Sequence, residues 1–307
     1  VDIDPLAVEL ARLALWIETM DRDLPFEFLD HKLKCGNSLV GCWFDRFRHY
    51  PVMAWSREGG DKDFNNFVHH FREHVAKSGK SKGEKKKEGD VWTAAIKEKR
   101  SQVIDDLSDC ITGQLSMARP AARLDPKKVH DEALALFNEM HAMPLFEAEA
   151  RADFYREKIL KSDSYVKLKS AFNAWCALWF WPADELDKAP MPHAFESLDA
   201  ASGAVVERLA AEHRFFHWEL EFPDVFAGQG SGFDTVLGNP PWETLQPMSK
   251  EFFSNIDPLY RALGKQDALS RQIDLFTKDE KVEQQWLKYN LYFKSITHWF
   301  RWASNPF

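Results

Sequence analysis

The sequence predicts an α/β fold in which a partial parallel sheet is interrupted by a long, mostly α-helical insertion. Residues 1–3 have strand character, and the stretch 26–39 includes a short second strand candidate that ends near residues 35–39; a helical pattern lies between them. A third such segment, residues 233–237 (FDTVL), lies between glycines much further along the chain. Strand, helix and strand in close succession are typical of a parallel sheet, and the helical patterns before the third strand form the insertion.

The first helix is predicted to begin at Asp4 and Pro5. Aspartate is a favoured N-cap, and proline is favoured in the first helical turn because its missing N–H has no partner there. The apolar residues that follow repeat at helical spacing: Leu6, Leu10, Leu13 and Ile17. This repeat predicts an amphipathic helix directly after the first strand segment.

The insertion is predicted to be helical over several stretches. Apolar residues recur at helical spacing in five of them: 92–117, 127–140, 147–160, 164–181 and 197–212. We therefore divide the chain into a first core segment (1–43), the insertion (44–212) and a resumed core with the start of a downstream region (213–307).

A lysine-rich stretch, residues 77–89, is expected to be a mobile loop within the insertion. Its lysines could contact a phosphate backbone, but a solvated linker is the simpler interpretation.

Composition excludes several classes of protein. The chain has 45% hydrophobic and 29% charged residues, which is typical of a globular protein, and its net charge of −8 excludes a uniformly DNA-coating surface. No apolar run is long enough to cross a bilayer, so we expect no membrane association. The four cysteines have no zinc-ligand spacing, and we predict reduced thiols in a cytoplasmic protein with no metal site.

Two further features are interpreted in structural terms. The histidines at 69, 70 and 74 have helical spacing but no convincing acidic partner, so we interpret them as an exposed helix face. The chain opens without Met and ends in RWASNPF, and we interpret both ends as cuts through a longer protein.

The strongest chemical signal is Asn239-Pro240-Pro241-Trp242, directly after the third strand segment. Two prolines stiffen the backbone, so the Asn239 side chain and nearby carbonyls become rigid acceptors beside a large aromatic ring. Such a site suits a planar heterocycle with an exocyclic amine, since the amine donates two hydrogen bonds while the ring stacks. A stiff turn without chemical function is the alternative interpretation.

Three sequence blocks carry a resemblance to a known family. They are VDIDPLAVELARLALWIE at the start, HKLKCGNSLVG at 31–41 and FDTVLGNPPWE at 233–243. The chain resembles the amino-directed DNA methyltransferases with a (D/N)PP(Y/F/W) motif, in the N6-adenine branch. It is similar in particular to the large methylases of type IIG and IIL restriction-modification enzymes and of the BREX and DISARM phage-defence systems. The segment 216–226 (FHWELEFPDVF) also resembles the region before the motif in those enzymes.

The resemblance implies roles for individual residues. Asp2 would hold the ribose hydroxyls of S-adenosylmethionine, and Ile3 would pack on its adenine ring. Asn37, with Ser38 beside it, would read the adenine amine of the cofactor. Residues 239–242 would bind the target adenine. Without the resemblance, Asp2 would be interpreted as a helix-start residue and Asn37 as a turn residue.

The resemblance also implies an architecture and a reaction. The fold would be a partial Rossmann-like methyltransferase sheet, and the reaction would be site-specific N6-adenine methylation of duplex DNA with the adenine flipped out of the helix. Restriction or phage-defence subunits would be partners. The family's glycine-rich cofactor loop would precede Val1, so we expect little activity from this chain alone.

Two alternatives remain open. RNA-adenine and protein-glutamine methyltransferases use related motifs, although Trp242, the CGNSL block and the bulky insertion argue against them. A non-catalytic, methylase-like binding module or scaffold is the third hypothesis. A glycine-rich loop upstream in the parent gene would exclude a methylase relic.

Overall fold

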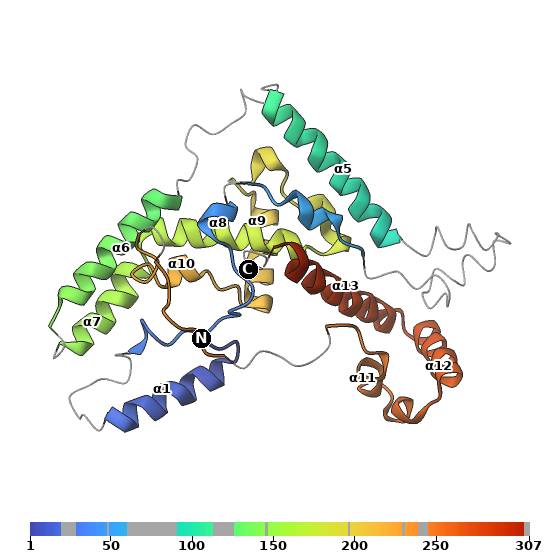
Figure 1. Ribbon diagram of the computed structural model, residues 1–307. Coiled ribbons are helices and arrows are strands. Elements are labelled where there is room, and N and C mark those ends of the chain that lie inside the picture. The colour runs from blue at the N-terminus through green and yellow to red at the C-terminus, as the bar shows by residue number, and fades with distance from the viewer. Residues whose placement is uncertain are drawn as a thin grey trace. The chain divides into compact units, whose positions relative to one another are not determined.

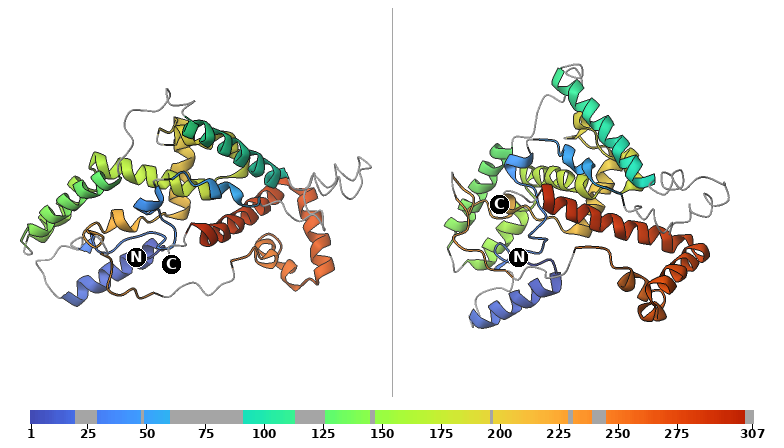
Figure 2. Two further views of the ribbon diagram at one scale, coloured as in Figure 1. Left: turned by 45° about the horizontal axis from the view of Figure 1, so that its top comes forward. Right: turned by 45° about the vertical axis from the view of Figure 1, so that its right-hand side comes forward.

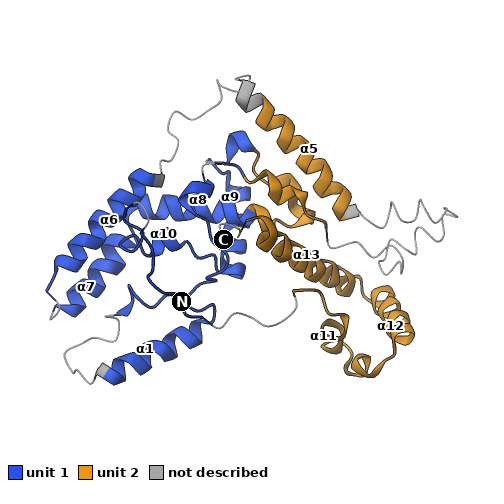
Figure 3. Ribbon diagram, viewed as in Figure 1, with its two compact units in different colours: residues 1–50, 114–177, 192–240 blue, residues 51–113, 178–191, 241–307 orange. Residues whose placement is uncertain are grey.

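The computed structural model describes residues 1–19, 29–47, 49–59, 91–112, 126–144, 147–195, 197–228, 231–238 and 245–303. The chain divides into two compact units, shown in Figure 3. Unit 1 consists of Val1–Tyr50, Gln114–Ala177 and Pro192–Pro240, and unit 2 of Pro51–Gly113, Leu178–Met191 and Pro241–Phe307. The predicted lysine-rich loop at 77–89 and the histidines at 69, 70 and 74 lie outside the described residues.

The elements of unit 1 are helices and helical turns, and Figure 1 labels α1 and α6 to α10 among them. They are α1 (Pro5–Thr19), α2 (Phe44–Phe47), α6 (Pro126–Ala142), α7 (Ala148–Phe154), the π-helical turn η4 (Tyr155–Ile159), η6 (Pro192–Ala194), α9 (Ala200–His213) and α10 (Trp218–Glu221). Helix α8 (Asp163–Phe180) belongs to this unit except for its last residues.

Unit 2 is also helical in its described part. Its elements are η2 (Val52–Ser56), α5 (Val91–Thr112), η5 (Ala183–Lys188), α11 (Ser249–Ser254), η7 (Pro258–Ala262), α12 (Lys265–Lys278) and α13 (Glu280–Trp302). Figures 1 and 2 show α11 and α12 near the beginning of the long helix α13. They share a core of mostly aromatic side chains: Phe253, Tyr260, Phe276, Val282 and Trp286.

The predicted helices are confirmed where the structure describes them. Helices α1, α6, α8 and α9 begin and end within a few residues of the predicted bounds. The stretch predicted at 92–117 is helical to Thr112, and the rest of it lies outside the described residues. Periodic apolar residues therefore located these elements correctly.

The predicted partial Rossmann-like sheet is wrong. The described residues contain no strand, and extended segments meet in two isolated parallel bridges, Asp2–Cys35 and Asn37–Phe215. A parallel ladder grows only while successive residues on both segments stay extended. Here the chain enters α1 at Pro5 and α10 at Trp218, so each pairing ends after one bridge.

The third predicted strand, residues 233–237, is extended but has no paired neighbour among the described residues. Its apolar side chains are not buried in a core: Val236 is 76% exposed and Leu237 is 92% exposed. Apolar character was therefore a poor guide to a buried strand at this position.

A buried arginine closes the end of α8. The guanidinium of Arg57 donates to the carbonyl oxygens of Leu178 and Trp179, both at 2.9 Å, and to that of Trp181. The last carbonyls of a helix have no partners within the helix and carry partial negative charge, so they can accept from a buried cation. Burial lowers the pKa of Arg57 to about 9.

No helix in the part of the chain that the structure describes is both long enough and apolar enough to span a bilayer.

Candidate functional site

Three segments of unit 1 that are far apart in the sequence lie side by side. The N–H of Asp2 donates to the carbonyl of Lys34 at 3.2 Å, and the N–H of Gly36 donates to the carbonyl of Asp2 at 2.8 Å. The next residue, Asn37, donates its N–H to the carbonyl of Arg214 at 2.7 Å. The start of the chain, the CGNSL block and the residues after α9 therefore meet at one place.

Two glycines allow this close approach. A Cβ on Gly36 would lie 2.6 Å from a ring carbon of Phe216, closer than real side chains come. A Cβ on Gly41 would overlap the backbone carbonyl of Phe216, which cannot move aside as a side chain can. The spacing of glycines in HKLKCGNSLVG therefore has a local structural cause: both positions lie against the chain that follows α9.

Asp2 and Ile3 lie just before α1, which begins at Pro5. The carboxylate of Asp2 accepts from the N–H of Asp4 at 2.8 Å, and that of Asp4 accepts from the N–H of Leu6 at 2.9 Å. Asp2 thus makes the helix-start contact that was the alternative interpretation of this residue. A carboxylate has acceptor sites to spare, and Asp2 is exposed. Ile3 is 50% exposed, so its side chain remains accessible.

Asn37 and Ser38 begin a turn. The Asn37 side-chain oxygen accepts from the N–H of Leu39 at 3.1 Å, which is the turn contact expected for Asn. The carbonyl of Ser38 accepts from the indole N–H of Trp218 at 2.9 Å. The Asn37 side chain is half-buried, and Ser38 is exposed. The roles of Asp2, Ile3, Asn37 and Ser38 in cofactor binding stay predictions.

Arg214 contacts both predicted cofactor segments, and no sequence motif pointed to it. It ends α9 in the left-handed region, with φ 51° and ψ 51°, which residues other than glycine seldom adopt. Its carbonyl accepts from Asn37, and its guanidinium donates to the carbonyl of Ile3 at 2.8 Å. The strained backbone of one residue thus allows it to contact both segments.

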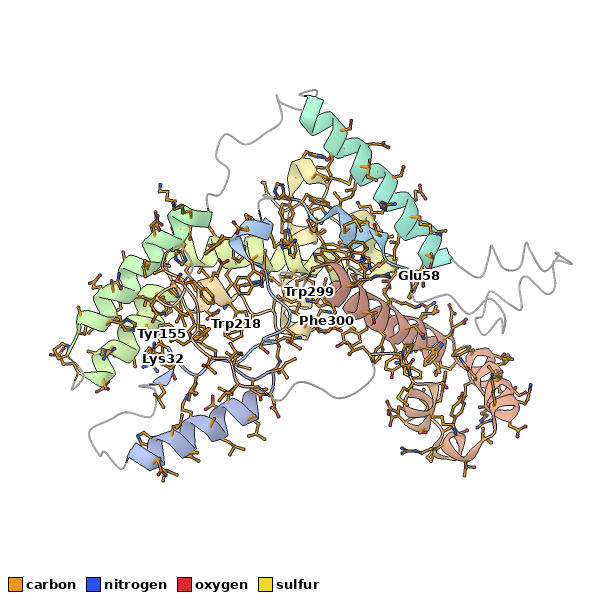
Figure 4. All side chains as sticks on the ribbon, viewed as in Figure 1. Lys32, Glu58, Tyr155, Trp218, Trp299 and Phe300 are labelled. Carbon is orange, nitrogen blue, oxygen red and sulfur yellow. The ribbon has the colours of Figure 1, made fainter. Side chains whose placement is uncertain are left out.

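A buried polar network lies beside these segments. Lys34, next to the Asp2–Cys35 bridge, places its ammonium 3.4 Å from the carboxylate of Glu221 and donates to the hydroxyl of Tyr155. Lys169 and the hydroxyl of Tyr165 each donate to Glu221 at 2.8 Å. Figure 4 shows Tyr155 among the side chains of unit 1. The network connects Lys34, just before the CGNSL block, with η4, α8 and α10.

Glu221 is charged in this network. Burial alone would raise its pKa, but Lys169 and Lys34, with hydrogen bonds from Lys169 and Tyr165, outweigh burial and lower the pKa to about 2. Burial lowers the pKa of Lys34, while the charge of Glu221 opposes that change. The position of Glu221 within the FHWELEF block was the available signal, but the sequence did not reveal its partners.

His217 is a further buried polar group of this region, with an exposed fraction of 0%. Its Nδ1 accepts from the N–H of Cys42 at 3.0 Å, so the ring proton is on Nε2, which donates to the side-chain oxygen of Asn173 at 2.9 Å. Burial, with a contribution from Lys169, lowers the pKa of His217 to about 3. The neutral ring therefore joins the 41–42 turn to α8.

The predicted target-base motif, Asn239, Pro240, Pro241 and Trp242, lies outside the described residues. The segment before it is described from Ser231 to Gly238. Phe233 packs there against three aromatic rings at centroid distances of 5.6 to 5.7 Å: Trp218, Phe222 and Phe226. The chain leading into the motif is therefore fixed to the FHWELEF region of the same unit.

Comparison with known proteins gives one match. Residues 125–301 match the model of a family described as Eco57I restriction-modification methylase. The match covers more than half of the 307 residues and includes the FHWELEF and NPPW blocks. No curated protein and no solved structure matches the chain. The blocks around Asp2 and Asn37 precede the matched residues.

Proposed function

Because the chain belongs to the Eco57I restriction-modification methylase family and is thus a restriction-modification methylase, we propose that it methylates N6 of adenine in DNA. S-adenosylmethionine is the proposed methyl donor. The target adenine is flipped out of the duplex, and the methyl group passes to it directly. The setting is a restriction-modification or phage-defence system, with duplex DNA and subunits of that system as partners.

The observation that supports this proposal is the meeting of the start of the chain with the CGNSL block. Asp2 bonds to Lys34 and Gly36, and Asn37 follows directly. The exposed carboxylate of Asp2 suits a ribose diol, and the half-exposed side chain of Ile3 suits the face of a purine. The side-chain amide of Asn37 can both accept hydrogen bonds from adenine and donate to it. The residues present therefore fit S-adenosylmethionine, whose sulfonium supplies an activated methyl group when bound.

The proposed work of the NPPW motif is electrostatic and positional. The lone pair of the adenine amine is delocalised into the ring, which makes the amine a poor nucleophile. Hydrogen bonds accepted by Asn239 and a neighbouring carbonyl concentrate that lone pair on nitrogen, without a covalent intermediate. Stacking on Trp242 offsets part of the few kcal/mol that flipping a base costs.

The test is methyl transfer by the full-length protein. Tritiated S-adenosylmethionine is offered with unmethylated duplex DNA, with RNA and with protein, and the labelled DNA is digested to nucleosides. We expect the label in N6-methyl-2′-deoxyadenosine from the DNA. Label in RNA or in glutamine would favour the other methyltransferase hypotheses, and the absence of transfer with intact cofactor binding would favour a non-catalytic module.

A further inference from the structure

Trp218 contacts both of the regions on which the proposed reaction depends. Its indole N–H donates to the carbonyl of Ser38 at 2.9 Å, in the turn that also contains Asn37. Its ring lies 5.6 Å from the ring of Phe233, nearly perpendicular at 79°. Figure 4 labels Trp218, which begins α10. One side chain therefore connects the turn at 37–39 with the chain that leads into the NPPW motif.

Phe233 is the anchor of the segment before the motif. The rings of Phe222 and Phe226 contact it at 5.6 and 5.7 Å, in addition to that of Trp218. Closer to the motif, Val236 is 76% exposed and Leu237 is 92% exposed. Phe233 is therefore the packed residue of this segment. If the NPPW motif moved relative to the turn at 37–39, the ring contacts of Phe233 would be strained before those of Val236 and Leu237.

The ring of Trp218 is itself held in place. It packs on Phe216 at 4.9 Å and on Phe222 at 5.9 Å. Phe216 donates its N–H to the carbonyl of Val40 at 2.8 Å, at the other end of the turn. The indole therefore cannot follow Phe233 without disturbing its hydrogen bond to Ser38.

We propose that Trp218 is a positioning residue that couples cofactor binding to binding of the target base. The inference rests on the proposed function, in which the turn at 37–39 contacts S-adenosylmethionine and residues 239–242 contact adenine. When the cofactor orders the turn, the hydrogen bond from Trp218 fixes the indole, and the indole fixes Phe233. Coupling of this kind is reciprocal, so DNA tightens cofactor binding by the same factor.

Substitutions can separate the two halves of this connection. Trp218→Phe removes the N–H that reaches Ser38 but retains a ring against Phe233. Phe233→Leu retains apolar volume but removes the ring that Trp218 contacts. Two matched controls are Trp302→Phe, at a tryptophan 46% exposed on α13, and Val236→Ala, at a residue 76% exposed in the Phe233 segment.

The experiment measures the Kd of S-adenosylmethionine for the full-length protein by calorimetry, with and without sheared unmethylated duplex DNA. We expect Trp218→Phe to weaken cofactor binding about fivefold, the usual effect of losing one hydrogen bond. We expect Phe233→Leu to bind the cofactor normally alone, while added DNA no longer tightens that binding. Both controls should match the wild type, including its DNA-induced tightening.

The inference is overturned if Trp218→Phe binds the cofactor as the wild type does, or if Phe233→Leu retains the wild-type response to DNA. Circular dichroism checks that each variant is folded. Should Trp218→Phe fail to fold, Phe233→Leu decides alone, since its side chain is 42% exposed and its loss is tolerated more easily. A wild type that binds no cofactor contradicts the proposed function as well, whereas normal coupling in all variants contradicts the role of Trp218 alone.

Discussion

The ammonium of Lys34 lies 3.4 Å from the carboxylate of Glu221, and the two side chains are only 7% and 8% exposed. The backbone carbonyl of Lys34 also accepts a hydrogen bond from the N–H of Asp2. The pair therefore ties α10 to the place where the start of the chain meets the CGNSL block. Two buried charges are stable here because each compensates the other and additional hydrogen bonds satisfy Glu221.

Glu221→Leu is expected to destabilise the protein by about 3–5 kcal/mol, because it leaves the buried charge of Lys34 without its partner. The double variant Lys34→Met/Glu221→Leu should recover much of that loss, since Lys169 is 38% exposed and can turn to water. Urea unfolding at neutral pH measures both. A double variant less stable than Glu221→Leu alone would show that the pair does not act as a unit.

The same pair predicts acid sensitivity. The pKa of Glu221 is lowered from 4.5 to about 2, so the unfolded chain takes up a proton at a higher pH than the folded protein does. The contribution of charged Glu221 to the free energy of unfolding is therefore fully present above about pH 4.5. It is lost as the pH falls toward 2.

His217 predicts a separate loss of stability at milder acidity. Its pKa is lowered from 6.5 to about 3, so below pH 6.5 the unfolded chain binds a proton that the folded protein does not. The unfolding free energy should therefore fall by about 1.4 kcal/mol for each pH unit between these values. His31 and His213, with pKa values also lowered to about 4 by burial, add to this slope.

His217→Asn isolates that contribution. Asparagine does not titrate and retains an acceptor for the N–H of Cys42. The variant should be less stable than the wild type at pH 7.5 but should lose less stability on going to pH 5. Urea unfolding at the two pH values gives the comparison, and equal slopes for the wild type and His217→Asn would refute the assignment.

Gly41 and Gly203 should respond in opposite ways to alanine. A Cβ on Gly41 would overlap the carbonyl of Phe216, so Gly41→Ala should destabilise the protein by about 1–3 kcal/mol. Nothing lies within 4 Å of a Cβ on Gly203, inside α9, so Gly203→Ala should stabilise it by about 0.5–1 kcal/mol. Thermal unfolding measures both changes. A neutral Gly41→Ala would mean that the close approach of the two chains is not required.

The sequence predicted helices well because their signal is local. The apolar repeat of α8, and the Asp4-Pro5 start and apolar repeat of α1, each indicate an element from a few neighbouring residues. The strands were predicted wrongly because the same short apolar run of sequence occurs in a paired β-strand, in a segment with a single β-bridge and in an exposed extended segment. Residues 233–237 took the last of these forms.

The site was predictable in part for the same reason. Asp2 and Asn37 were singled out from motifs, but the contacts that bring their segments together depend on residues far along the chain. Glu221 resembles an exposed acid in the sequence, since glutamate is seldom buried without a partner, and its partners lie on other elements. The left-handed conformation of Arg214 has no sequence signal, because glycine is the residue expected there.

Asn239→Ala tests the chemistry most directly. The substitution removes the proposed acceptor for the adenine amine, so methyl transfer by the full-length protein should fall by at least about 100-fold. Because the turn at 37–39 is unchanged, the Kd of S-adenosylmethionine should stay near the wild-type value. Tritium transfer to DNA and calorimetry measure the two quantities. Gln246→Ala, downstream of the motif, is the control for nonspecific effects. Lost cofactor binding with normal turnover would contradict the assignment, because a residue that acts on the target base must affect the reaction more than the binding of the methyl donor.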